Sequence, residues 1–101
     1  MPYEVVWNKE AGNDLDELFA YLVEHASLWD AENVSTQALN STRYLARFPR
    51  LYEAAPQYGK GIRRISVAGR VVLYKVDDRA RIVRVVAVVG GRSEPRKTRR
   101  S

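Results

Sequence analysis

Several residue types that support common protein chemistries are absent or rare in this 101-residue chain. It has no cysteine, which excludes disulfides, thiolate metal sites and cysteine nucleophiles. Its single histidine, His25, has no motif that places a serine and an acid beside it, so no serine triad is expected. No apolar run in the chain, Val85–Val89 included, is long enough to span a membrane. Because the N-terminus also lacks a signal-peptide pattern, we expect a cytoplasmic protein without membrane association.

Motifs for metals and cofactors are equally scarce. The acidic residues of the first half spread over a solvent-exposed helix face, without the other ligands that a metal site needs. The stretch "GKGIRR" has the wrong glycine spacing for a phosphate-binding loop and opens a strand rather than a helix. We therefore expect no catalytic residue, no metal site and no cofactor.

What the chain does have is a strong segregation of charge. Residues 1–32 hold eight acidic residues and one lysine, a net charge of −7. Residues 33–91 hold eleven basic and three acidic residues, a net charge of +8, and the last ten residues add +4. A basic half of this kind favours an anionic partner, either nucleic acid or an acidic protein segment, and charge alone does not choose between them.

Hydrophobic spacing predicts two amphipathic helices in a hairpin. Asn8 is placed to cap the first helix, and "SLWD" at Ser27–Asp30 matches a capping box that starts the second one almost immediately. Pro49 ends the second helix. The apolar positions with helical spacing are Leu15, Leu18, Phe19, Leu22 and Ala26 in the first helix, and Ala31, Val34, Ala38, Leu45 and Phe48 in the second.

Four strands are predicted around this hairpin. They are Tyr3–Trp7, Ile62–Val67, Val71–Val76 and Arg81–Val89, and the last is apolar on both faces, which indicates a central strand. Residues 50–61 are too apolar for a free linker and should pack on the body. The order predicts an α+β fold: an N-terminal strand, an antiparallel helix hairpin, and a three-stranded antiparallel meander in one sheet. We expect a single domain over residues 1–91 and a basic, flexible tail over residues 92–101.

Cationic side chains on the predicted sheet are the candidate binding residues. They are Arg63, Arg64, Arg70, Lys75, Arg84 and Arg92, with Arg81 beside them. Weaker contacts are expected from the tail residues Arg96, Lys97, Arg99 and Arg100. A solvated face neutralised by the acidic helices of the same chain is the alternative. The tyrosines Tyr44, Tyr52, Tyr58 and Tyr74 are expected to pack the core and loop rather than to stack on bases.

The order of several short segments resembles the RelE/ParE superfamily of type II toxins over roughly residues 3–92. The segments are "DLDELFAYL", Ala31, "YLARFP", "GIRRI", "VVLYKV" and "VVAVVGGR". The long helix hairpin and the order of these landmarks make the chain more similar to ParE than to RelE. The resemblance implies a toxin that poisons DNA gyrase without enzymatic activity, and a cognate ParD-like antitoxin with an acidic C-terminal segment.

RelE-type members imply another activity, ribosome-dependent cleavage of messenger RNA by basic sheet residues and a C-terminal tyrosine. Arg92 matches their arginine after the last strand, but Val71 stands at their strand arginine and no tyrosine follows Tyr74. Arg70 is displaced by one residue and should point to the opposite face. The ribosome and messenger RNA thus remain alternative partners, and a non-toxic family member that binds an antitoxin is a third possibility.

Overall fold

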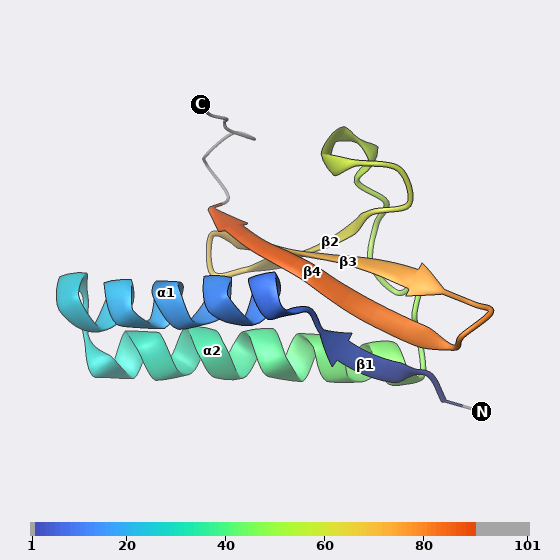
Figure 1. Cartoon of the computed structure of the whole chain (residues 1–101). Helices are drawn as coiled ribbons and strands as arrows, with labels where there is room; N and C mark the ends of the chain where they lie inside the picture. The colour runs from blue at the N-terminus through green and yellow to red at the C-terminus, as the bar shows by residue number, and fades with distance from the viewer. Residues whose placement is uncertain (1, 91–101) are drawn as a thin grey trace.

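The structure, a computed structural model, describes residues 2–90. Strand β1 (Glu4–Trp7) precedes helices α1 (Lys9–His25) and α2 (Leu28–Arg43), and strands β2 (Arg63–Val67), β3 (Arg70–Asp77) and β4 (Ile82–Gly90) follow. Figure 1 shows the helix hairpin on one side of a twisted sheet. This arrangement confirms the predicted α+β fold. Neither helix has the length and apolar composition of a membrane span, within the described residues.

The four strands form one sheet in the order β1-β4-β3-β2. The three C-terminal strands are antiparallel, as predicted, and β1 adds a parallel pair with β4, so the sheet is mixed. Strand β4 is central, which explains why it is apolar on both faces. A β-bulge shifts the β3–β4 register between Leu73 and Tyr74.

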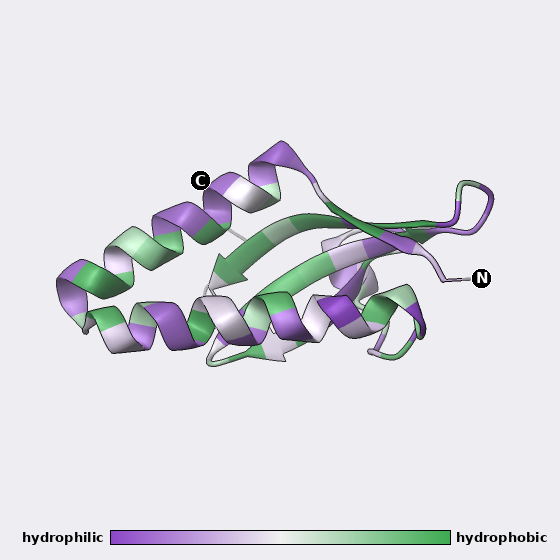
Figure 2. Ribbon diagram, turned by 90° about the horizontal axis from the view of Figure 1, so that it is seen from below, coloured by the Kyte–Doolittle hydropathy of each residue, from purple (hydrophilic) through white to green (hydrophobic). Residues whose placement is uncertain are grey.

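Two apolar clusters fix the faces of this sheet. One includes Val72, Tyr74 and Val85 and packs under the helices with Ala11 and Leu45; we call this side the inner face. On the opposite side, Val71 and Leu73 pack with Ala55 and Ile62 from the loop after α2, which confirms that this loop packs on the body. We call this side, which also carries Arg64, Lys75 and Arg84, the outer face. Figure 2 shows α1 and α2 alternating between hydrophilic and hydrophobic residues, as expected for helices with one buried side.

The helix caps agree only in part with the sequence analysis. Ser27 accepts a hydrogen bond from the N–H of Asp30 (3.0 Å), and its hydroxyl donates to Asp30 Oδ2 (2.9 Å). The Asp30 carboxylate thus accepts a hydrogen bond from the Ser27 hydroxyl. The capping box predicts instead that this carboxylate accepts from a backbone N–H at the helix start. Asn8 makes no side-chain cap bond, and its backbone N–H donates to the Val85 carbonyl (2.9 Å), which continues the strand pairing.

The second helix ends earlier than predicted. Its α-helical part stops at Arg43, and a tighter helical turn, η1 (Tyr44–Ala46), follows. Pro49 disfavours the α conformation at Phe48, which rules out a continuation past this point, and the tighter turn begins already at Tyr44. The change of phase buries Leu45 completely but leaves Phe48 57% exposed. The predicted core position at Phe48 is therefore wrong.

Candidate functional site

The predicted cations lie on three neighbouring strands but on both faces of the sheet. Arg64 of β2, Lys75 of β3 and Arg84 of β4 lie on the outer face. Arg63 and Arg70 lie on the inner face, in the same alternation as the buried Ile65 and Val72. Because successive strand residues point to opposite faces, the run Arg63–Arg64 could not have contributed two cations to one surface. Arg92 and the tail cations lie outside the described residues.

The two arginines of β2 are held by the loop that follows α2. Arg63 Nη1 donates to the Tyr52 carbonyl at 2.6 Å, and Arg64 Nε donates to Glu53 Oε2 at 2.6 Å. Glu53, which lies outside these strands, thus gives Arg64 an acidic partner. The loop reaches β2 because Ala54 forms an isolated antiparallel bridge with Arg63. The Arg64 charge is therefore partly compensated within the chain.

Lys75 and Arg84 form the least compensated part of the outer face. They are direct register partners across the antiparallel β3–β4 pair, and both are exposed. Like charges placed directly opposite one another destabilise a sheet. Within residues 2–90, no carboxylate forms an ion pair with either side chain. An external anion would relieve this repulsion, which makes the pair a candidate binding site.

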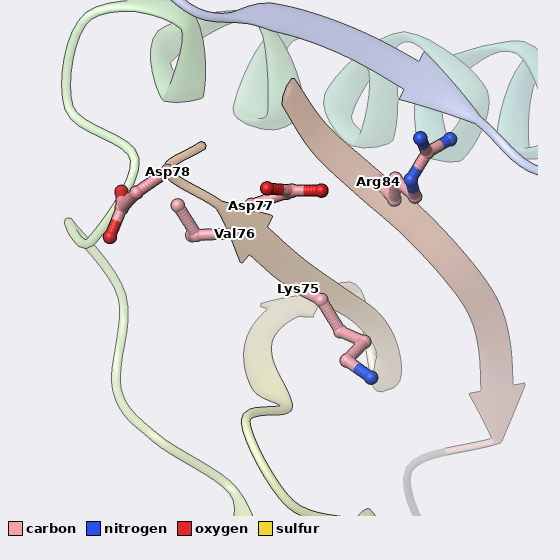
Figure 3. A pocket seen from close by; sticks show the side chains of 5 residues that line it. All are labelled: Lys75, Val76, Asp77, Asp78 and Arg84. Atoms are coloured by element: carbon pink, nitrogen blue, oxygen red, sulfur yellow. The ribbon is translucent and has the colours of Figure 1, made fainter. Parts of the chain in front are cut away.

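A shallow pocket of about 360 Å³ accompanies this pair. It is lined by Lys75, Val76, Asp77, Asp78 and Arg84, as Figure 3 shows. Asp77 Oδ1 accepts a hydrogen bond from the N–H of Ala80 (3.0 Å), so this carboxylate helps to fix the β3–β4 turn. Asp78 is directed away from the strand, toward the loop after α2 (Figure 3).

Asp78 belongs to a polar cluster that the sequence analysis missed. Arg50 donates to it through both terminal nitrogens (3.1 and 2.7 Å), and the Tyr3 hydroxyl donates to Oδ1 at 2.6 Å. These hydrogen bonds, with that of Arg50 the largest cause, lower the Asp78 pKa from 3.8 to about 2. The Arg81 guanidinium lies 4.7 Å from the centre of the Tyr3 ring. The cluster joins the N-terminus, the loop after α2 and the β3–β4 turn.

A second missed contact joins α1 to the sheet. Asp14 Oδ2 accepts a hydrogen bond from the backbone N–H of Val88 at 3.0 Å, close to the bulge in β4. Partial burial of Asp14 raises its pKa, because the charged form loses hydration. The contact is long-range in sequence, so helical and strand periodicity gave no signal for it. It fixes where β4 runs beneath α1.

The last tyrosine and the only histidine of the chain lie away from Lys75 and Arg84, whereas the carboxylates of Asp77 and Asp78 line the same pocket as these two cations. Tyr74, the last tyrosine of the chain, is completely buried on the inner face, and burial raises its pKa. The ring of His25 stacks on Tyr21 at the loop end of the helix hairpin, with 4.4 Å between ring centres. Among residues 2–90, no group of three or more acidic or histidine side chains could hold a metal ion. The described outer face therefore presents cations suited to holding an anion.

Comparisons with known proteins agree with this fold. The chain matches the family model described as the ParE toxin of the type II toxin-antitoxin system parDE over residues 5–95. A search of curated proteins finds no match.

Three solved structures show the same fold. One is from a chromosomal ParDE system of P. aeruginosa, with TM-score 0.74, 13% identity, and 87% of this chain and 95% of that chain covered. A second is from the RelBE2 toxin-antitoxin complex of Mycobacterium tuberculosis, with TM-score 0.64, 20% identity and coverage of 89% and 99%. A third is a mutant of the E. coli toxin RelE in the free state, with TM-score 0.68, 16% identity and coverage of 94% and 90%.

The family model covers most of the chain and includes every described strand and helix apart from the first residue of β1. The architecture and the sequence landmarks agree with it. The chain therefore belongs to the ParE family of type II toxin-antitoxin toxins, within the RelE/ParE superfamily.

Proposed function

We propose that this protein inhibits DNA gyrase by binding it, without enzymatic activity, and that a cognate antitoxin neutralises it. The match to the ParE family model over residues 5–95 supports a ParE-type activity. A gyrase target implies action in the cytoplasm. We retain residues 1–91 as the toxin domain and residues 92–101 as a basic tail.

The chemistry of RNA cleavage supports this choice over the RelE-type alternative. Cleavage next to a 2′-hydroxyl requires one group that removes a proton and another that donates one. Arginine stays charged and serves these roles poorly. Tyr74 is buried away from solvent, Val71 offers no functional group, and Arg70 lies on the inner face. At the described positions that correspond to RelE-type cleavage residues, the chain thus offers no exposed group suited to proton transfer.

The pair Lys75–Arg84, which forms no ion pair within the described residues, is the observation that carries the proposed antitoxin site. An acidic antitoxin segment would place a carboxylate between the two cations and relieve their repulsion. Arg64 lies on the same face, and its Glu53 partner is 63% exposed, so this ion pair can exchange partners at low cost. The binding set predicted from the sequence is Arg63, Arg64, Arg70, Lys75, Arg84 and Arg92. Within this set, the proposal places the main antitoxin contacts at Lys75 of β3 and Arg84 of β4.

A supercoiling assay with purified DNA gyrase tests the toxic activity. The proposal expects loss of supercoiling as toxin is added, and recovery after preincubation with the antitoxin encoded by the adjacent reading frame. An unchanged rate at saturating toxin rejects gyrase inhibition. In that case, cuts in messenger RNA on programmed ribosomes would establish the RelE-type activity, and harmless accumulation of folded toxin without antitoxin would establish a non-toxic member.

A further inference from the structure

One face of helix α1 carries a row of acidic side chains and one tyrosine, outside the site described above. The members follow one another at steps of three or four residues within the α-helix, so they lie on the same side of it. Glu10 and Glu17 are exposed, Tyr21 is 52% exposed, and the Glu24 side chain is 79% exposed. We call this face the α1 stripe, and its members are Glu10, Asp14, Glu17, Tyr21 and Glu24.

The negative charge of the α1 stripe is little compensated. Within the described residues, Glu10, Asp14 and Glu17 form no ion pair, and Glu24 has only His25, at 3.9 Å. Like charges one turn apart on a helix repel each other. Burial is the largest cause that raises the Asp14 pKa, and the charges of Glu17 and Glu10 raise it further. Glu24 also lies in the last turn of α1, where the helix dipole disfavours a negative charge.

The end of β4 lies beside this stripe. Asp14 accepts its hydrogen bond from the N–H of Val88, and β4 ends two residues later at Gly90. Figure 1 shows that β4 runs toward the loop end of the helix hairpin, as α1 does. A chain that continued along the line of β4 would therefore pass from Asp14 toward Glu24.

The segment that follows β4 has the opposite charge and sufficient length. The six residues from Gly90 to Arg96 span up to about 20 Å when extended. Asp14 and Glu24 are about 15 Å apart along the helix axis. Residues 92–101 hold a single acid, Glu94, and five cations, Arg92, Arg96, Lys97, Arg99 and Arg100.

We propose that the basic tail, residues 92–101, docks along the α1 stripe of the same molecule. Its cations pair with the stripe carboxylates, and the exposed Tyr21 ring offers a further contact for a guanidinium group. The tail begins close to the stripe, so the entropy cost of closing the contact is small. Docking withholds the tail cations from anionic partners. It does not depend on gyrase inhibition or on the Lys75–Arg84 site.

A spin label on the tail tests this contact in the full chain. Because the chain has no cysteine, Thr98→Cys provides a single labelling site. Backbone amide signals of the isotopically labelled protein then report which residues the label approaches. We expect selective broadening of the signals of residues 17–25. High salt should reduce this broadening, because it screens exposed charges.

Neutral variants of the stripe measure the contribution of its charges. Glu17→Gln should lower the broadening by about twofold, and the double variant with Glu24→Gln should lower it further, because exposed ion pairs are individually weak. Asp16→Asn is the matched control. It removes the same charge from an exposed position about 100° around the helix from Glu17, so it should leave the broadening unchanged.

Three results overturn the proposal. The first is broadening that is absent or that spreads evenly over residues 2–90. The second is broadening that persists in the double variant, or that falls as much in Asp16→Asn as in Glu17→Gln. The third is broadening between molecules, observed when spin-labelled protein is mixed with isotopically labelled protein that carries no spin label. That result would assign the α1 stripe to a second copy of the chain.

Discussion

Lys75 on β3 and Arg84 on β4 lie directly opposite each other on the outer face of the sheet. No carboxylate forms an ion pair with either of them within residues 2–90. A protein selected for stability alone would place opposite charges at these two positions. The proposed antitoxin segment would supply a negative charge at this pair.

A charge reversal at one member should separate stability from binding. Lys75→Glu creates an opposite-charge pair with Arg84, so we expect the free energy of unfolding to rise by about 0.2–1 kcal/mol. Chemical denaturation of the two proteins in low salt measures the change. A clear loss of stability would show that the Lys75 ammonium is compensated in the native protein.

The Tyr74 side chain should stabilise the fold through its buried ring and not through its hydroxyl. That hydroxyl is buried and makes no hydrogen bond of ordinary geometry within the described residues, although the Tyr52 backbone is close enough to lower its pKa, so Tyr74→Phe should change the free energy of unfolding by between about 0 and +1 kcal/mol. Tyr74→Ala should instead cost about 3–5 kcal/mol. Urea denaturation tests both variants. A clear loss of stability in Tyr74→Phe would contradict this expectation, because the hydroxyl would then make a stabilising hydrogen bond.

Leu45 and Phe48 should respond differently to truncation. Leu45 is completely buried, so Leu45→Ala should cost about 2–5 kcal/mol of stability. Phe48 is exposed, so Phe48→Ala should change stability by less than about 0.5 kcal/mol. Thermal unfolding of the two variants provides the comparison. Similar losses would mean that the helical phase continues unchanged to Pro49.

The cluster around Asp78 should make stability depend on acidic pH. Because its folded pKa is lowered to about 2, the ionised Asp78 contributes stability that is complete above its ordinary pKa and is lost as pH falls through the folded value. Asp78→Asn should therefore lower the melting temperature at neutral pH, and the difference from the native protein should shrink between about pH 4 and pH 2. A difference that stays constant over this range would contradict the ion pair with Arg50.

The fold was predictable because its signals are local. Helical spacing such as Leu15–Leu18–Leu22 marked the hairpin, and the apolar run Val85–Val89 marked the central strand. The end of α2 was not predicted, because a tighter turn before Pro49 rotates Phe48 outward while keeping Leu45 inside. Hydrophobic spacing alone does not show where an α-helix changes to a tighter turn.

The candidate site was predictable only in outline. Sequence counting found the cations, and strand alternation could have assigned Arg63 and Arg64 to opposite faces. The hydrogen-bond partners of these polar side chains could not be predicted from the sequence. Glu53 contacts Arg64 from a loop, and Tyr3 is 75 positions away from Asp78. Contacts of this kind depend on the tertiary fold, which periodicity does not describe.

The measurement that tests the central claim most directly is the affinity of the cognate antitoxin for a variant that combines Lys75→Glu and Arg84→Glu. Calorimetric titration should show binding weakened by more than about tenfold, because two attractive contacts become repulsive. Arg79→Glu, an exposed charge reversal in the β3–β4 turn, is the control and should bind like the native protein. An unchanged affinity of the folded double variant would contradict the account, because the outer-face cations would then not hold the antitoxin.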